Sequence, residues 1–418
     1  MTDKKTTIET FIEKTLTANT EQTVDVLIRI TPPEIEQTDS NRPKLNLAMV
    51  LDRSGSMQGR KIEEAKEAAK YCIDQLLATD RISTVIFDQQ IDVLIPSQPV
   101  ENKELLKRSI NSIVTAGSTA LHEAWVSGGL QVSDHLNGAS INRVLLITDG
   151  QANVGETRID SIVTQAGELA AKGVTTSTIG IGADFNEDLL MPMAEAGLGN
   201  AWHVQEPQDM VRIFETELQG LVSQIGHTVR LGIRPTPGVT IVDVLNDFET
   251  DGAGRYKLPN LRASSPLEIV VRLRVPSHNV GDDSQLADLE LSYVEQETNA
   301  LATITTSFRA TFDTAEVTAS LASNPDVINA VQLLMNARAR LEVIARMDQG
   351  DFAGMQDILA CAMDLTDIQA SRLDSPRLRR EAAELAELGQ ALESRENDVF
   401  SRKRMAYTRD LRRKGREE

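Results

Sequence analysis

The chain has 418 residues and a formal net charge of −19 at pH 7, with 62 acidic and 43 basic side chains. A single hydrophobic core rarely grows to this size, so the length predicts two to four domains. The acidic balance argues against nucleic-acid binding as the main task, because a phosphate backbone repels a protein of this charge. Aromatic residues make up only 4% of the chain, so we expect cores built from Leu, Ile, Val and Ala.

The N-terminus and the cysteines indicate a reducing compartment. The first twenty residues lack the apolar segment of a signal peptide, and no stretch approaches the roughly 20 apolar residues that cross a bilayer. Cys72 and Cys361 lie far apart, each within an expected amphipathic helix, which favours two buried thiols over a disulfide. We therefore expect a cytoplasmic protein without a membrane span.

Residues 43–223 alternate apolar runs with segments of helical periodicity. Strands buried on both faces and joined by helices form a parallel sheet with helices on each side. The run at residues 91–96 follows its neighbour after a short polar turn and is expected as an antiparallel edge strand. These patterns predict a doubly wound, mostly parallel, Rossmann-like α/β domain. Its helices are expected at residues 59–78, 102–114, 119–132, 158–172, 186–196 and 207–223.

After residue 223 the pattern changes to short segments in which apolar and polar residues alternate. Val229, Leu231 and Ile233, for example, share one face of such a segment. Alternation of this kind, with Pro, Gly and Asn between the segments, predicts an antiparallel β-sandwich over residues 224–315.

Residues 23–30 alternate in the same way, although they precede the α/β domain. We expect the N-terminal segment, residues 1–42, to contribute this strand to the sandwich. The α/β domain would then be inserted between sandwich strands. An extra edge strand on the α/β sheet is the alternative.

Residues 316–418 are expected to be helical. Apolar residues such as Val327, Val331 and Leu334 recur at three- and four-residue spacing, and a break at residues 348–354 indicates a helical hairpin. The final segment, residues 400–416, holds eight basic residues and one acid, Asp410. It could bind RNA, anionic lipid or an acidic protein. We expect instead a solvated charged helix or a tail folded against its own acidic body.

Polar oxygens follow the ends of expected strands. Asp52, Ser54 and Ser56 form a D-x-S-x-S pattern after one apolar run, Asp149 follows another, and Thr119 begins a helix after a Gly-Ser turn. Ligands of open α/β sheets bind beyond the carboxyl ends of the strands, so we expect these five residues to gather. A site that offers oxygen ligands and no His or Cys favours Mg²⁺ or Mn²⁺. Taken singly, Ser56 or Thr119 could instead be a helix cap.

The motifs D-R-S-G-S-M, G-S-T-A-L and T-D-G, in this order, resemble the metal-ion-dependent adhesion site of von Willebrand factor A (VWA) domains, such as integrin inserted domains. The resemblance covers residues 43–223. It implies that Ser54, Ser56 and Thr119 contact Mg²⁺, Mn²⁺ or Ca²⁺ directly, while Asp52 and Asp149 act mainly through water. The wider arrangement is similar to bacterial proteins called calcium-activated chloride-channel-like and to inter-alpha-trypsin inhibitor heavy chains.

Signals of catalysis are weaker. The five histidines are scattered, and none pairs with Cys or an acid at catalytic spacing. His122 could line the rim of the site, but a surface or core histidine is expected. The R-S-G-S stretch lacks the flanks of a nucleophile elbow, and no phosphate-binding loop exists. We therefore expect no enzymatic activity.

A binding module is the expected function, in which the cation's open position takes an Asp or Glu from a partner protein. The resemblance implies that such binding can be linked to movement of the last helix of the domain, residues 207–223. Two alternatives are a non-catalytic adaptor of a MoxR- or chelatase-type AAA+ ATPase, with which related domains work, and a structural protein that oligomerises through its helical region.

Overall fold

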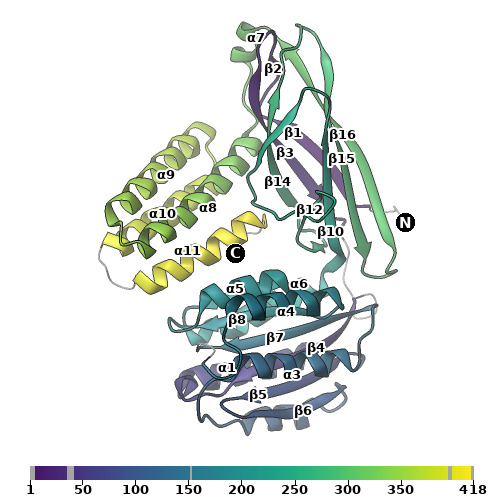
Figure 1. The fold of residues 1–418 in the computed structure, drawn as a ribbon, viewed down its shortest axis with the longest axis vertical. Coiled ribbons are helices and arrows are strands. Elements are labelled where there is room, and N and C mark those ends of the chain that lie inside the picture. Colours follow the sequence, from purple (N-terminus) through teal and green to yellow (C-terminus); the bar gives the residue numbers. More distant parts are fainter. Residues whose placement is uncertain (1–4, 35–41, 151–152, 394–397, 416–418) are drawn as a thin grey trace. The chain divides into compact units, whose positions relative to one another are not determined.

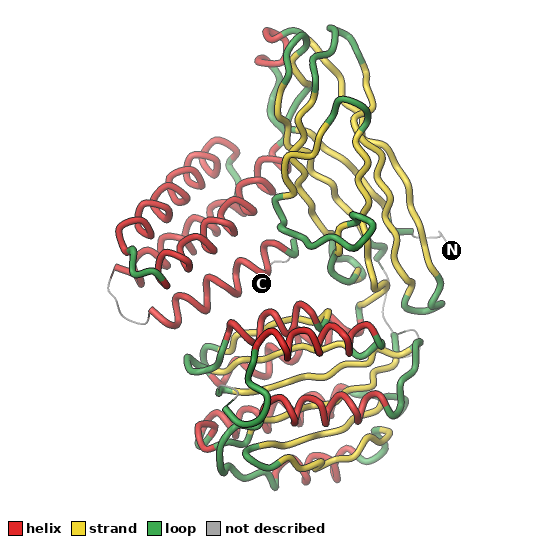
Figure 2. Tube along the Cα trace, viewed as in Figure 1, coloured by secondary structure: helices red, strands yellow, loops and turns green. Residues whose placement is uncertain are grey.

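The computed structural model describes residues 5–34, 42–150, 153–393 and 398–415. The chain divides into two compact units. The α/β unit comprises Glu36–Gln224 with Gln296–Asn299, and the sandwich unit comprises the rest. The sandwich and the C-terminal helices, which the sequence pattern treats as separate regions, therefore belong to one unit (Figures 1 and 2).

A six-stranded sheet in the order β6-β5-β4-β7-β8-β9 forms the centre of the α/β unit. β6 pairs antiparallel with β5, and the other neighbours pair parallel. This arrangement confirms the expected mostly parallel α/β fold with an antiparallel edge strand. The strands are β4 (Lys44–Asp52), β5 (Arg81–Phe87), β6 (Ile91–Pro99), β7 (Ser140–Thr148), β8 (Thr175–Ile181) and β9 (Leu198–Val204).

Helices cover both faces of this sheet, because strands such as β4 are apolar on both sides. Leu47, Met49 and Leu51 enter one core, and Ala48 and Val50 enter the other. The first core is covered by α1 (Arg60–Gln75), α2 (Lys103–Asn111) and α6 (Met210–Val222), and the second by α3 (Leu121–Ser133), α4 (Ile159–Ala171) and α5 (Glu187–Ala196). Two short 3₁₀ turns, η1 (Gly55–Met57) and η2 (Pro207–Asp209), precede α1 and α6.

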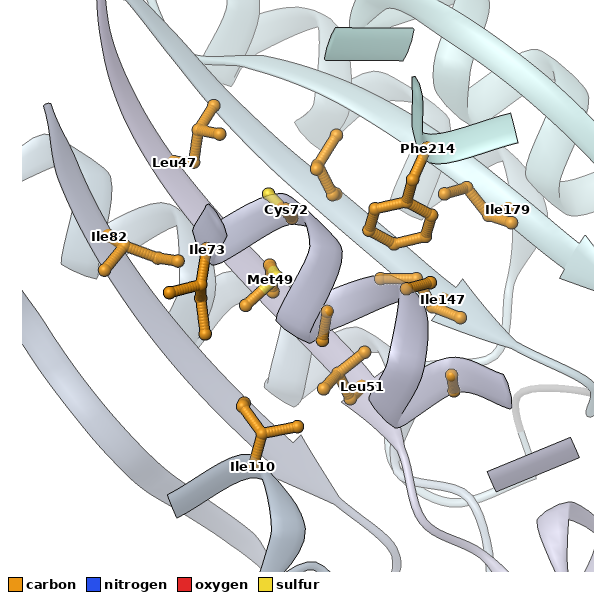
Figure 3. Packing of buried hydrophobic residues seen from close by; sticks show 14 of the residues in the cluster. Leu47, Met49, Leu51, Cys72, Ile73, Ile82, Ile110, Ile147, Ile179 and Phe214 are labelled. Atoms are coloured by element: carbon orange, nitrogen blue, oxygen red, sulfur yellow. The ribbon is translucent and has the colours of Figure 1, made fainter. Parts of the chain in front are cut away.

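The first core includes one of the two cysteines. Figure 3 shows Cys72 and Ile73 of α1 around Met49, and Phe214 of α6 belongs to the same cluster. Burial raises the pKa of the Cys72 thiol to about 12. This side chain therefore acts as a small apolar group, as the sequence pattern predicted, and stays protonated at neutral pH.

A buried polar network attaches α6 to the sheet. The Glu217 carboxylate is 1% exposed and accepts hydrogen bonds from Ser177 Oγ (2.6 Å), Asn200 Nδ2 (2.6 Å) and Trp202 Nε1 (2.9 Å). Arg143 Nη1 on β7 lies 3.8 Å from Glu217 Oε1 and donates to Ser177. A buried charge is tolerated only with such partners, so α6 has one preferred position on the sheet.

Replacing Glu217 with Ala is expected to lower the free energy of unfolding by about 3–5 kcal/mol, because Arg143 stays buried without its counter-charge. Urea denaturation measures this change. Glu215→Ala, at an exposed position of the same helix, should change the free energy of unfolding by less than about 0.5 kcal/mol. Equal effects of the two substitutions would contradict the anchoring role.

The sandwich unit contains two sheets that share one core. The four-stranded sheet has the order β1-β3-β14-β11, and the other has the order β12-β10-β15-β16-β2 with β13 beside β10. β2 pairs parallel with β16, and the other neighbours along these two orders pair antiparallel. The strands are β1 (Thr7–Ile12), β2 (Leu16–Thr17), β3 (Gln22–Thr31), β10 (Gln224–Pro235), β11 (Thr240–Val244), β12 (Tyr256–Lys257), β13 (Leu261–Arg262), β14 (Leu267–Val275), β15 (Asp283–Glu295) and β16 (Leu301–Asp313).

The N-terminal strand has a definite place in this topology. Residues 23–30, for which the sequence pattern left two positions open, lie in β3 and pair with β14. They are not part of the α/β sheet. β1, which lies on the other side of β3, was not predicted from the sequence.

Among its described residues, the sandwich unit also has the helices α7 (Ala315–Ser320), α8 (Pro325–Asp348), α9 (Phe352–Leu373), α10 (Pro376–Glu393) and α11 (Asp398–Arg413). α8 and α9 form the expected hairpin, with Gly350 at a φ of 72° in the turn. Cys361 on α9 is exposed, so the expectation of a second buried thiol was wrong. Helical spacing alone does not tell which apolar positions of a helix find a partner. Within the described ranges, no helix combines the length and apolar character needed to cross a membrane.

The basic C-terminal segment folds against acidic residues of its own unit. Arg402 pairs with Asp348 (3.0 Å), Arg404 with Glu387 (3.1 Å) and Arg412 with Glu381 (3.1 Å). Of the two forms expected for this tail, the structure has the one folded against the chain's acidic body. Arg416 lies outside the described residues.

The ion pairs of this region differ in burial. Glu381 is completely buried and also pairs with the buried Arg340, whereas Glu387 is 65% exposed. Burial opposes ionisation of Glu381, but Arg340 and Arg412 outweigh it and lower its pKa. A lowered pKa in the folded state stabilises the fold above the unfolded-state value, and this stabilisation is lost as the pH falls.

Glu381→Gln is expected to lower the free energy of unfolding at pH 7 by about 3 kcal/mol, because two arginines lose their buried partner. Glu387→Gln, which removes an exposed pair from the same helix, should cost less than about 1 kcal/mol. Thermal and urea unfolding at several pH values provide the measurement. The difference between wild type and Glu381→Gln should narrow below the carboxyl's ordinary pKa of 4.5, and a pH-independent difference would count against this explanation.

Candidate metal centre

Three loops meet at the carboxyl end of the parallel sheet. Asp52 ends β4, Asp149 directly follows β7, and these two strands are neighbours. Backbone hydrogen bonds attach the third loop, since Ala116 N donates to Arg53 O (2.8 Å) and Gly55 N donates to Gly117 O (3.1 Å). Residues from three distant parts of the chain are thereby held at one point.

Four of the five residues expected to form the site are linked by hydrogen bonds. Asp52 Oδ1 accepts from the backbone N of Ser54 (2.8 Å), and Ser54 Oγ lies 3.1 Å from Ser56 Oγ. Ser56 Oγ donates to Asp149 Oδ1 (2.7 Å). The structure therefore brings Asp52, Ser54, Ser56 and Asp149 together.

The fifth residue, Thr119, faces the same space from the opposite loop. A Cβ atom built on Gly150 would lie 3.3 Å from Thr119 Oγ1 and 3.8 Å from Asp52 Oδ2. The backbone N of Thr119 donates to Asn153 Oδ1 (3.0 Å). The absence of a side chain at Gly150 thus leaves a small polar space between the Thr119 hydroxyl and the Asp52 carboxylate.

The two carboxylates are fully buried, and Ser54 and Thr119 are nearly so. Burial raises the pKa of Asp52 to about 6, although hydrogen bonds from Thr148 and Ser54 act in the opposite direction. Two buried acids near one another favour a nearby positive charge. The electrostatics of the site therefore favour a cation.

Two further residues support the carboxylates and were not predicted from the sequence. Thr148 Oγ1 donates to Asp52 Oδ2 and accepts from the backbone N of Gly150 (3.1 Å). Lys61 Nζ, in the first turn of α1, donates to Asp149 Oδ2. Thr148 is the residue before Asp149, which was a usable signal, whereas nothing in the sequence pattern connected Lys61 with Asp149.

His122 lies in α3, three residues after Thr119, but its Nε2 pairs with Gln165 (2.9 Å) and its ring lies 6.1 Å from that of Trp125. Its ring therefore contacts Gln165 of α4 and Trp125 of its own helix.

The donor set fits a hard divalent cation. Hydroxyl and carboxylate oxygens are the ligands that Mg²⁺, Mn²⁺ and Ca²⁺ accept, and the side chains of the five expected site residues offer both kinds and no nitrogen or sulfur ligand. Groups of three or more His, Cys, Asp or Glu that could hold a metal do not occur among the described residues. A metal at this centre would therefore depend on hydroxyls as well as acids.

In open α/β sheets, polar loops at the carboxyl end of the strands are where ligands bind when they are present. Comparison with known proteins is more specific, because residues 46–216 match the von Willebrand factor type A domain. This match lies within the α/β unit and agrees with the motifs of that unit.

Relatives and solved structures agree with the match to this domain. An uncharacterised protein of Synechocystis sp. is 31% identical over 188 residues, which are 45% of this chain and 44% of that protein. Human inter-alpha-trypsin inhibitor heavy chain H3 is 26% identical over 197 residues, 45% of this chain and 22% of its own length. The chain thus covers less than half of these two relatives.

A solved structure described as von Willebrand factor type A from Catenulispora acidiphila matches 94% of this chain and 91% of its own, with a TM-score of 0.69 and 19% identity. At this identity the likeness concerns the fold, and it extends over both units.

Replacing Thr148 with Val is expected to lower the free energy of unfolding by about 1–3 kcal/mol, because a buried carboxylate loses a donor. Thr84→Val is a matched control, since Thr84 is buried in β5 and its hydroxyl has no hydrogen-bond partner among the described residues. The control should be neutral or slightly stabilising. Urea denaturation of both variants without added metal tests the difference, and equal stabilities would refute the role given to Thr148.

Proposed function

We propose that this chain is a metal-dependent protein-binding module. VWA domains are generally protein-interaction modules, and the observation that carries the proposal is the linked set of Asp52, Ser54, Ser56 and Asp149, with Thr119 facing the same space. These five residues would hold the cation, with the hydroxyls as direct ligands and the carboxylates acting mainly through water. Mg²⁺ is the first candidate and Mn²⁺ or Ca²⁺ the next.

The chemistry that a bound cation would supply is attraction of an external acid. Neutral hydroxyls take up coordination positions without cancelling the ion's charge, and Mg²⁺ prefers six oxygen ligands. An Asp or Glu side chain of a partner protein can supply the missing oxygen. The acid would enter beside Ser56, which is exposed while Asp52 and Asp149 are buried.

Catalysis is not part of the proposal. General acid–base chemistry needs a side chain that can exchange a proton with a bound substrate. The Asp52 and Asp149 oxygens already accept hydrogen bonds from Ser54, Thr148, Ser56 and Lys61. This arrangement supports a fixed cation-binding site better than a proton-transfer site.

A large movement of α6 is not part of the proposal either. Coupling energies between sites are typically about 1–3 kcal/mol. Breaking a buried ion pair such as that of Glu217 with Arg143 costs about 3–5 kcal/mol. The cost of breaking this ion pair exceeds a typical coupling energy, so we expect α6 to stay in place when a partner binds.

Removal of either carboxylate tests the metal site. Asp52→Asn and Asp149→Asn are expected to weaken Mn²⁺ and Mg²⁺ binding by at least tenfold, about 1.4 kcal/mol, because each removes one of two negative charges near the ion. Isothermal titration calorimetry measures the affinities. Asp134→Asn, at an exposed position, serves as the charge-matched control and should bind like wild type. Wild-type affinity in both site variants would refute the assignment.

Partner capture tests the function itself. Immobilised wild-type chain should retain a partner in Mg²⁺ buffer and release it in EDTA, while Asp52→Asn should retain none. Mass spectrometry of the retained proteins identifies the partner. An AAA+ ATPase among them would support the adaptor role, whereas equal capture with Mg²⁺ and with EDTA would overturn metal-dependent binding.

A further inference from the structure

Lys61 occupies a fixed position beside the proposed cation. Gly59, at a φ of 84°, turns the chain into α1, so that Lys61 falls in the first turn of that helix. Its ammonium donates to Asp149 Oδ2, and Asp184 Oδ2 lies 3.9 Å away. The side-chain stem runs past Gly182, where a built Cβ would lie 3.7 Å from Lys61 Cε. Lys61 is therefore held between two loops of the sheet's carboxyl end.

This position changes the charge of the site. Asp52 and Asp149 carry two negative charges, and Lys61 adds one positive charge, which leaves −1. A divalent cation brings the sum to +1. Without Lys61 the same sum would be −2 + 2 = 0, and the bound ion would attract an external carboxylate less strongly. Asp184 is 77% exposed, so solvent screens its contribution more than that of the buried acids.

We propose that Lys61 is a positioning and charge-setting residue that weakens metal binding and strengthens capture of a partner's carboxylate. The proposal rests on the proposed function of the site. Its distinctive consequence is that loss of the Lys61 charge changes the two affinities in opposite directions. A purely structural role, in which Lys61 only orients Asp149, would change both in the same direction.

Two substitutions separate charge from hydrogen bonding. Lys61→Gln keeps an amide donor, on a side chain one atom shorter, but removes the charge, and Lys61→Arg keeps the charge. Lys70→Met is the matched control, because Lys70 lies on the same helix, pairs with Glu67 and is similarly accessible at 20%. At about 1.5 Å per residue, Lys70 is two and a half turns away from the site.

The first measurement is Mn²⁺ affinity by isothermal titration calorimetry with the full chain. Lys61→Gln is expected to bind Mn²⁺ about three- to tenfold more tightly than wild type, because a repelling charge near the ion is gone. Lys61→Arg and Lys70→Met should bind like wild type. Unfolding in urea without metal verifies that each variant is folded.

The second measurement uses acetate as the carboxylate probe. Titrating acetate into the Mn²⁺-loaded chain should displace manganese-bound water and lower the water-proton relaxation rate. Lys61→Gln is expected to need at least threefold more acetate than wild type, and Lys61→Arg should restore the wild-type value. A Lys61→Gln variant that weakens both Mn²⁺ and acetate, or changes neither, would overturn the proposal.

Failure of this proposal is distinguishable from failure of the proposed function. If the wild-type chain binds no Mn²⁺, the metal site itself is wrong, and so is the role of Lys61. If the wild type binds Mn²⁺ and acetate but Lys61→Gln does not separate the two affinities, only the role of Lys61 is wrong.

Discussion

The α/β unit depends on the burial of two like charges at the ends of neighbouring strands. Asp52 and Asp149 are both inaccessible to solvent, and an isolated buried carboxylate is strongly unfavourable in a protein interior. Donors from Ser54, Thr148, Ser56 and Lys61 compensate for the lost water. The pairing of β4 with β7 and the hydrogen-bonded loops keep those donors in reach. The surrounding fold can therefore be understood as a support for this local arrangement.

The same donors explain why the site is pre-organised. A side chain whose position is set by neighbours loses little further conformational entropy when a ligand arrives. Ser56 is both a link to Asp149 and the accessible edge of the site. Its hydroxyl can turn from the carboxylate toward an incoming ion with little rearrangement of the backbone. Rigid carboxylates and one accessible hydroxyl suit a centre that exchanges its outermost ligand.

Sequence periodicity was enough to predict the α/β sheet. Strands such as β4 are apolar on both faces, and few other structures accommodate that pattern. β1 was not predicted because TIETFI lacks strict alternation of apolar and polar residues, and none of its residues is fully buried. The gathering of the five site residues was predictable because strand ends of a parallel sheet converge at one edge. Lys61 was not, since its contact with Asp149 spans 88 positions and depends on how α1 leaves η1.

The pairing of β3 with β14 has a consequence for how the protein is made. Arg272 on β14 contacts Asp25 on β3 across 247 positions of the chain. During synthesis the N-terminal strands must wait until the whole α/β unit and part of the sandwich have left the ribosome. Domains generally fold as units in the order of their emergence, so the inserted α/β unit can form first and shorten the effective distance between the waiting strands. The sandwich, although it takes strands from before the α/β unit, would then mature after that unit.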